Sequence, residues 1–186
     1  MGLMGMKNPK VVDDNTILHY SKMYEIPLED NYKLDSSYLT FLFSHDTAVY
    51  APQIKNHYQA LQALYFDKSK QLRSFQINCD AGGMPNLKWN RDEIMTTFPP
   101  KEQAPLDNLL SLDTQLKYLR PLAQTSKLVV SNYDYIVVIY WSRWMGRQSK
   151  RFIHVIQENS KLSAGKNIKI IYVNNDNMFA GADIEK

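Results

Sequence analysis

The side chains of this sequence that could do chemistry gather in one short stretch, W-S-R-W-M-G-R-Q-S-K-R, at residues 141–151. The stretch holds two hydroxyls, of which Ser149 lies at the expected start of a helix, and four cations around that start: Arg143, Arg147, Lys150 and Arg151. Cations beside the positive end of a helix dipole oppose helix stability, but together with exposed N–H groups they can bind an anion. Two interpretations stay open. The cations bind an anionic ligand or acidic partner, or they form a solvated face whose long side chains lie over Trp144.

Catalysis by Ser149 would need a base within hydrogen-bonding reach of its hydroxyl. The next histidine, His154, follows five residues later, about 140° around a helix, so the two side chains do not share a face. We therefore expect Ser149 to be a solvated or capping hydroxyl of the first helical turn. Thiol chemistry needs a thiolate, and Cys79 is the single cysteine of the chain, which excludes an intramolecular disulfide.

Motifs for metals and cofactors are absent from the sequence. Four histidines occur without the spacing of metal ligands: His19, His45, His57 and His154. No glycine-rich nucleotide-binding motif occurs, so we expect no metal and no cofactor. Asn174-Asn175-Asp176 follows an expected strand where α/β folds place ligand loops, although a turn is the commoner reason for these residues. The net charge of +3 is too small to predict nucleic-acid binding.

The second half of the chain predicts a βαβ unit that would position the cationic stretch. Residues 136–140 form a β-branched and aromatic run typical of a strand buried on both faces. Residues 147–162 have apolar side chains at helical spacing, and residues 168–173 form a second apolar run. We expect Trp141, next to the first run, to be buried, and Trp144, in the following turn, to be an exposed contact residue.

The rest of the chain predicts a mixture of helices and strands. The expected helices are residues 16–24, 38–43 and 106–119, the last of them behind Pro105. For residues 38–43 a strand is the alternative, because Asp35 favours a helix start whereas the aromatic residues favour a strand. The expected strands are residues 31–34, 60–66 and 71–79, of which the last two form a hairpin. A helix over residues 52–66 is the rival interpretation for the first hairpin strand. Residues 45–56 are expected to be loop and residues 78–83 a turn. No apolar run approaches the roughly 20 residues that a transmembrane helix needs.

The junction between the first strand and the helix of the βαβ unit resembles the motif of thioredoxins. In that family a strand ending in W-x-x-W runs into C-G-P-C-K at the start of a helix. Both tryptophans, the glycine and the lysine recur in W-S-R-W-M-G-R-Q-S-K. Met145 stands at the first cysteine position, one extra residue follows the glycine, and Ser149 stands where the second cysteine would fall.

The resemblance implies an α/β fold with a thioredoxin-like mixed sheet flanked by helices. Its elements would be permuted, with a β-hairpin and a helix before the βαβ unit. Residues 1–37 would form an N-terminal arm with a short helix, and residues 38–186 the thioredoxin-like domain, together one folding unit. Because the redox cysteines are replaced, the resemblance implies a redox-inactive protein.

A second resemblance extends over most of the chain. K-N-P-K near the start, F-D-K-S-K-Q-L and N-C-D-A-G in the middle, and V-I-Y-W and V-N-N-D near the end are similar to a group of often exported proteins of Bacteroidetes-type bacteria. Residues 1–6 lack the basic and long apolar regions of a signal peptide. This resemblance implies the cell envelope, as a periplasmic or lipid-anchored protein, if an export signal precedes Met1, and the cytoplasm otherwise.

From these observations we predict a non-catalytic binding or interaction protein associated with the envelope. Its partner would be a protein or an anionic ligand, and not a nucleic acid. The predicted binding surface is the thioredoxin-like motif itself: Trp144, Met145, Gly146, Arg147, Gln148, Ser149, Lys150 and Arg151. The alternative is a small-ligand enzyme on the same fold that uses Ser149 or Cys79.

Overall fold

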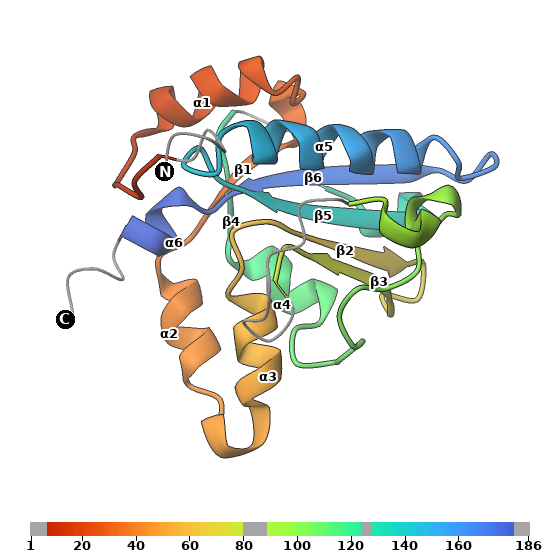
Figure 1. Cartoon of the computed structure of the whole chain (residues 1–186), viewed down its shortest axis with the longest axis horizontal. Coiled ribbons are helices and arrows are strands. Elements are labelled where there is room, and N and C mark those ends of the chain that lie inside the picture. The colour runs from red at the N-terminus through yellow and green to blue at the C-terminus, as the bar shows by residue number, and fades with distance from the viewer. Residues whose placement is uncertain (1–6, 80–88, 124–127, 181–186) are drawn as a thin grey trace.

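A six-stranded mixed sheet forms the centre of the fold (Figure 1). The computed structural model describes residues 7–79, 89–123 and 128–180. The strands lie in the order β3-β2-β5-β6-β1-β4, with bounds Leu72–Ile77, Gln62–Asp67, Tyr135–Trp141, Ile168–Asn174, Asn31–Leu34 and Leu119–Pro121. β5, β6 and β1 run parallel, β2 is antiparallel to both β5 and β3, and β4 is antiparallel to β1. The prediction of an α/β fold with a mixed sheet is confirmed.

The predicted βαβ unit is present. β5 and β6 pair in parallel along their whole length, and α5 (Arg147–Ser160) connects them. Nearly all of β5 is buried, as expected for a strand covered on both faces. α5 places Phe152, Ile153 and Ile156 in the core. The chain returns to β6 through Gly165, whose φ of 82° lies in the region that favours glycine.

The predicted hairpin is also present, as β2 and β3. The Asp67 side chain fixes its turn, because Oδ1 accepts hydrogen bonds from the backbone N–H groups of Ser69 (2.9 Å) and Gln71 (3.0 Å). β2 lies beside β5, so the hairpin and the βαβ unit form one continuous sheet. The expected turn at residues 78–83 lies mostly outside the described residues.

A helix stands where the sequence predicts a loop. Residues 47–57 form α3 (Thr47–His57), so the loop prediction for residues 45–56 is wrong. Asp46 begins the helix by accepting a hydrogen bond from the N–H of Ala48 (2.8 Å). Pro52 lies inside α3, where it removes one helical hydrogen bond, and the signals for this helix are weak for that reason. The rival helix over residues 52–66 is wrong beyond His57, because β2 follows.

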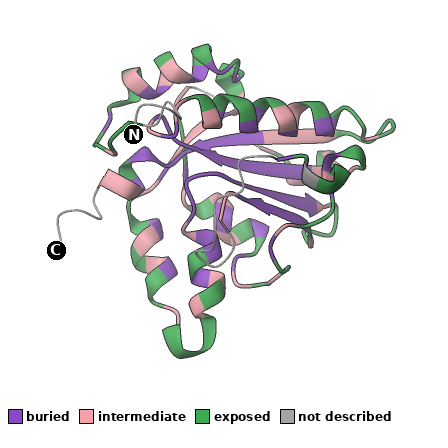
Figure 2. Ribbon diagram, viewed as in Figure 1, coloured by how far each residue is buried: buried purple, intermediate pink, exposed green. Residues whose placement is uncertain are grey.

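The two faces of the sheet carry different helices (Figure 1). α1 (Asp14–Met23) and α5 cover one face, and α2 (Ser37–Phe43), α3 and α4 (Leu112–Lys117) cover the other. α1 and α2 confirm the helices predicted there. Figure 2 shows the strands largely buried and the outer sides of the helices exposed. Each face therefore has its own apolar core, and the sheet separates the two cores.

The helix expected over residues 106–119 is much shorter than predicted. Only α4 forms, and its start is set by Ser111, whose side chain accepts a hydrogen bond from the N–H of Thr114 (3.1 Å). Upstream, Asp107 Oδ1 accepts from the N–H of Leu109 (3.0 Å), a local bond that competes with helix formation. Leu119 pairs with β1 as part of β4 instead of continuing the helix.

Short elements complete the described chain. They are three 3₁₀ helices, η2 (Leu28–Asp30), η4 (Arg91–Thr96) and η5 (Val130–Asn132), and the C-terminal helix α6 (Asp176–Ala180). β1 falls within the segment expected as an N-terminal arm and lies between β6 and β4 in the sheet. Among the described helices, none has the length and apolar character needed to cross a bilayer.

Candidate binding site at the carboxyl ends of β5 and β6

The carboxyl ends of β5, β6 and β1 meet at one edge of the sheet, because the three strands are parallel. From this edge β5 leads to α5 on one face, whereas β1 leads to α2 on the other. In α/β sheets, ligands bind at such edges, where successive connections leave in opposite directions. The polar segments that follow β5 and β6, at residues 142–146 and 175–177, both lie here.

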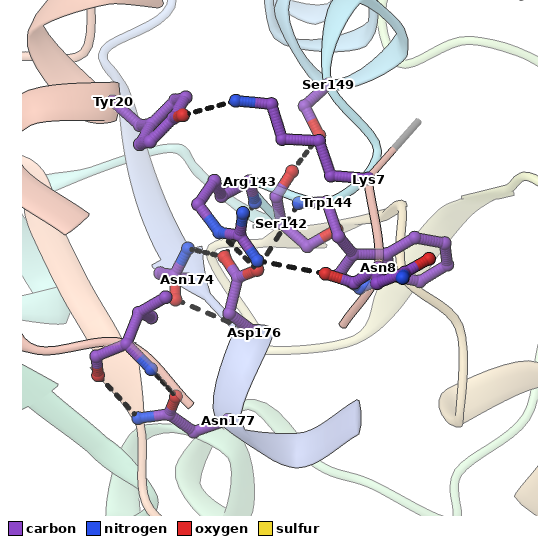
Figure 3. Close-up of polar contacts among 11 residues, drawn as sticks. Lys7, Asn8, Tyr20, Ser142, Arg143, Trp144, Ser149, Asn174, Asp176 and Asn177 are labelled. Carbon is purple, nitrogen blue, oxygen red and sulfur yellow. Dashed lines mark hydrogen bonds and ion pairs between the residues drawn. The ribbon is translucent and has the colours of Figure 1, made fainter. Parts of the chain in front are cut away.

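Asp176 is the buried centre of this edge (Figure 3). Its carboxylate accepts hydrogen bonds from the backbone N–H groups of Arg143 (2.6 Å) and Trp144 (3.3 Å) and from the side chain of Asn174 (2.7 Å). Arg143, also buried, places its Nε 3.6 Å from Asp176 Oδ1. One carboxylate therefore ties the loop after β5 to the end of β6.

Opposing effects act on the pKa of the Asp176 carboxyl group. Burial raises the pKa of Asp176, while the Arg143 N–H, the Asn174 amide and the Arg143 guanidinium act in the opposite direction. The net effect is that the pKa of Asp176 is raised above its ordinary value. The guanidinium keeps its charge at any ordinary pH, so it needs this carboxylate as its partner.

An extended N-terminal segment, residues 7–12, crosses this edge, and we call it the strap. Its Lys7 N–H donates to the carbonyl of Trp144 (2.7 Å), and Arg143 Nη2 donates to the carbonyl of Asn8 (3.1 Å). At its other end, the N–H and the carbonyl of Val12 bond the two ends of the Asn177 amide, at 2.8 and 3.1 Å. The strap thus joins both polar segments of the edge (Figure 3).

The predicted binding surface divides into an inner and an outer part. Trp144 is half-buried, with its ring edge-on to Phe179 (5.6 Å between centroids), so it is less exposed than expected. Trp141 is buried as predicted, and Met145 is buried as well. Gly146 precedes the first turn of α5 with φ 55°, and Gln148 is half-buried in that turn.

Ser149 belongs to the inner part. It is fully buried, and its Oγ donates a hydrogen bond of 2.5 Å to the carbonyl of Ser142. The prediction of a solvated or capping hydroxyl is therefore wrong: this hydroxyl links α5 to the loop after β5. His154 is exposed on the same helix and offers Ser149 no base.

The outer part consists of Arg147, Lys150 and Arg151, which are all exposed and which we call the basic face. Lys150 Nζ lies 3.0 Å from Glu25 Oε1, and this hydrogen bond lowers the pKa of Glu25. Arg143 does not belong to this face, contrary to expectation, because it points inward to Asp176. α5 has no side-chain cap and no acidic residue in its first turn.

Other candidate groups lie elsewhere. Cys79 is a half-buried cysteine just beyond β3. His57 is buried and pairs with Asp107 on the other face of the sheet. Within the described ranges, no three His, Cys, Asp or Glu side chains come together as a metal site. A hollow of about 490 Å³ lies at the opposite edge of the sheet, where Tyr135 begins β5.

Sequence reasoning missed the strap and Asn177. The pair Arg143–Asp176 was also missed, although Asp176 stands in the expected loop after a strand. Comparison of the chain with protein-family models, with curated protein sequences and with solved structures gives no match. A function for this edge must therefore be argued from its own geometry.

Proposed function

We propose that the protein is a non-catalytic binding protein that contacts an acidic partner or anionic ligand through the basic face. The observation that carries the proposal is the exposure of Arg147, Lys150 and Arg151 together at the N-terminal end of α5. The helix dipole places positive partial charge at the same end, so the three cations oppose the stability of the helix that bears them. A bound anion would relieve this repulsion.

The rest of the α5 N-terminus adds to the electrostatic argument. Gly146 offers no side chain to cap the helix, and no carboxylate lies in the first turn. The ion pair of Lys150 with Glu25 is exposed, so it neutralises the face only weakly. A solvated face without a partner is the competing interpretation, and the experiment below separates the two.

The packing of the motif supports binding over catalysis. Met145 cannot ionise and is buried, and Ser149 is buried with its hydroxyl donated to Ser142. The side chains nearest to the two cysteine positions of the thioredoxin motif therefore serve the fold. What the motif presents outward is positive charge.

We further propose that the scaffold is a permuted relative of the thioredoxin-like folds. Its support is the combination, in one mixed sheet, of a βαβ unit with an antiparallel hairpin beside the first strand of that unit. The Trp-x-x-Trp segment at the end of β5 adds to this support. The similarity of several segments to exported proteins favours the cell envelope as the location.

The proposal can be tested with a triple variant, Arg147→Gln, Lys150→Gln and Arg151→Gln. The matched control removes three exposed lysines away from α5: Lys55→Gln, Lys101→Gln and Lys117→Gln. Both variants lose the same charge, so a difference between them reports position and not net charge. Circular dichroism confirms that each is folded.

The probe is a fluorescent deca-glutamate peptide, and its binding is followed by anisotropy at low and at physiological salt. We expect the triple variant to bind about tenfold more weakly than wild type, and the control variant to bind like wild type. A crosslinking pull-down from the envelope fraction then compares the same three proteins. Equal binding by the triple variant and wild type would refute the basic face as a binding surface.

A further inference from the structure

The polar contacts between the strap and the sheet edge are made by the main chain of the strap. The atoms that contact the edge are the N–H of Lys7, the carbonyl of Asn8, and the N–H and carbonyl of Val12. They meet the Trp144 carbonyl and the side chains of Arg143 and Asn177, which together we call the strap site. The Lys7 ammonium bonds elsewhere, to the Tyr20 hydroxyl of α1 (2.6 Å).

The strap side chains contribute little to this contact. Lys7, Asn8, Lys10 and Val11 are exposed, Val11 at 69%. Val12 is the exception, since it is 6% exposed and packs in the core with α1 and α5. Main-chain hydrogen bonds give affinity without sequence preference, and a pocket for a side chain gives selectivity. The strap site therefore selects an extended backbone followed by one apolar residue.

The side chains that bind the strap are preorganised by contacts within the rest of the protein. Arg143 is fixed by Asp176, so its Nη2 points at the Asn8 carbonyl without further ordering (Figure 3). Asn177 begins its contacts from the first turn of α6 and presents both a donor and an acceptor to Val12. A donor and acceptor pair facing one residue is how a peptide backbone is recognised at a strand edge.

We propose that the strap site is a peptide-binding site for an extended segment of a partner polypeptide, and that residues 7–12 occupy it within the same chain. A tethered segment competes at an effective concentration of millimolar order. A partner segment therefore binds only when it outcompetes the strap or when the strap is withdrawn. The strap site shares no residue with the basic face, so the two proposals stand or fall separately.

The test uses a chain that begins at Asp13, so that the strap is removed and the N-cap of α1 is kept. The probe is the strap itself, the hexapeptide K-N-P-K-V-V, acetylated so that its first nitrogen remains an amide and labelled at its carboxyl end. Anisotropy should show saturable binding to the shortened chain. Binding to the full chain should be at least about tenfold weaker, because the strap competes.

Two controls separate backbone recognition from apolar contact. A peptide with an N-methyl group on its last residue loses the bond to Asn177 Oδ1, and Asn177→Leu in the shortened chain loses both bonds to that residue. Each change should weaken binding about fivefold to tenfold. Equal binding in both controls would overturn the proposal, because the contact would then be apolar and unspecific.

If the shortened chain does not fold, the full chain with Val12→Asp takes its place. The carboxylate would be buried without a partner at that position, so the strap leaves while Arg143, Trp144 and Asn177 stay intact. We expect this variant to bind the unmodified hexapeptide in trans. A folded strap-free or Val12→Asp chain that binds no hexapeptide up to about 1 mM would overturn the proposal. A segment tethered at an effective concentration of millimolar order stays bound only if its own dissociation constant is about 1 mM or lower.

Discussion

Two carboxylates in this protein each pair with a buried nitrogen-bearing side chain, and their surroundings differ: Asp176 is fully buried, whereas Asp107 is partly exposed. Asp176 receives two backbone N–H groups, one amide and the guanidinium of Arg143. Asp107 receives the Nε2 of His57 (3.1 Å) and the N–H of Leu109 (3.0 Å), both on Oδ1. In the described part of the chain, Asp107 Oδ2 and His57 Nδ1 are buried without a hydrogen-bond partner.

The difference reflects what each pair connects. The Arg143–Asp176 pair joins the strap, the end of β5 and the end of β6, which are far apart in the sequence. The His57–Asp107 pair fastens the end of α3 to the loop before α4, with the imidazole stacked on Phe75. The candidate site is therefore organised by a pair whose carboxylate accepts several hydrogen bonds, whereas the second pair anchors a loop.

The largest effect is expected for Arg143→Met, which leaves Asp176 buried without its cation. Removal of one partner of a buried ion pair costs about 3–5 kcal/mol of unfolding free energy. Urea denaturation followed by circular dichroism measures it. The matched control is Arg151→Met, an exposed position where we expect little change. A loss below about 1 kcal/mol for Arg143→Met would show that water or another group compensates Asp176, and would remove the contrast between the pairs.

A smaller effect is expected for His57→Phe. The new ring keeps the stacking on Phe75, and Asp107, with 11% of its side chain exposed, keeps the N–H of Leu109. The loss of one hydrogen bond should cost about 1–2 kcal/mol in the same denaturation experiment. If His57→Phe costs as much as Arg143→Met, the second pair is not merely a loop anchor.

The Arg143–Asp176 pair can also be tested by changing the pH. Because burial raises the pKa of Asp176, the folded protein binds this proton more tightly than the unfolded chain does. Its contribution to stability is fully present below the unfolded pKa of about 3.9 and is lost as the pH rises through the folded pKa. The stability difference between wild type and Asp176→Asn should therefore be larger near pH 4 than near pH 7. Carboxylates shared by both proteins cancel in this difference, and a difference that grows toward pH 7 would contradict the pKa direction.

The smallest effect is expected for the exposed pair of Lys150 and Glu25, which provides a solvated reference for the other two pairs. Glu25→Gln should leave the unfolding midpoint unchanged at physiological salt, because water and ions screen this contact. Measurement of the midpoint in urea with and without added salt checks this. A clear loss of stability that salt abolishes would mean that the basic face is already neutralised within the chain.

Local patterns of the sequence predict the βαβ unit, the hairpin and the helices α1 and α2. The β-branched run of β5 and the helical spacing in α5 need only neighbouring residues to be recognised. α3 was missed because Pro52 interrupts its pattern, and the helix over residues 106–119 was overextended because its leucines pack from a loop, from α4 and from β4.

The candidate site was only partly predictable for a different reason. The cations of the basic face lie within five residues of one another, and their helix was predicted, so their exposure could be anticipated. Arg143 and Asp176 are 33 residues apart, and the strap residue Val12 and its partner Asn177 are 165 apart. Contacts of this kind depend on the order of strands in the sheet, which no local pattern specifies.

The position of β1 has a consequence for the way this chain is made. β1 comes early in the sequence, yet its parallel neighbour is β6, the last strand of the described chain, and its other neighbour is β4. Most of the polypeptide must therefore be synthesised before β1 can pair with its neighbouring strands. Contacts between residues so far apart in the sequence form slowly. Until these strands pair, the nascent chain exposes apolar strand surface. We therefore expect production of this protein to depend on chaperones that shield such surface.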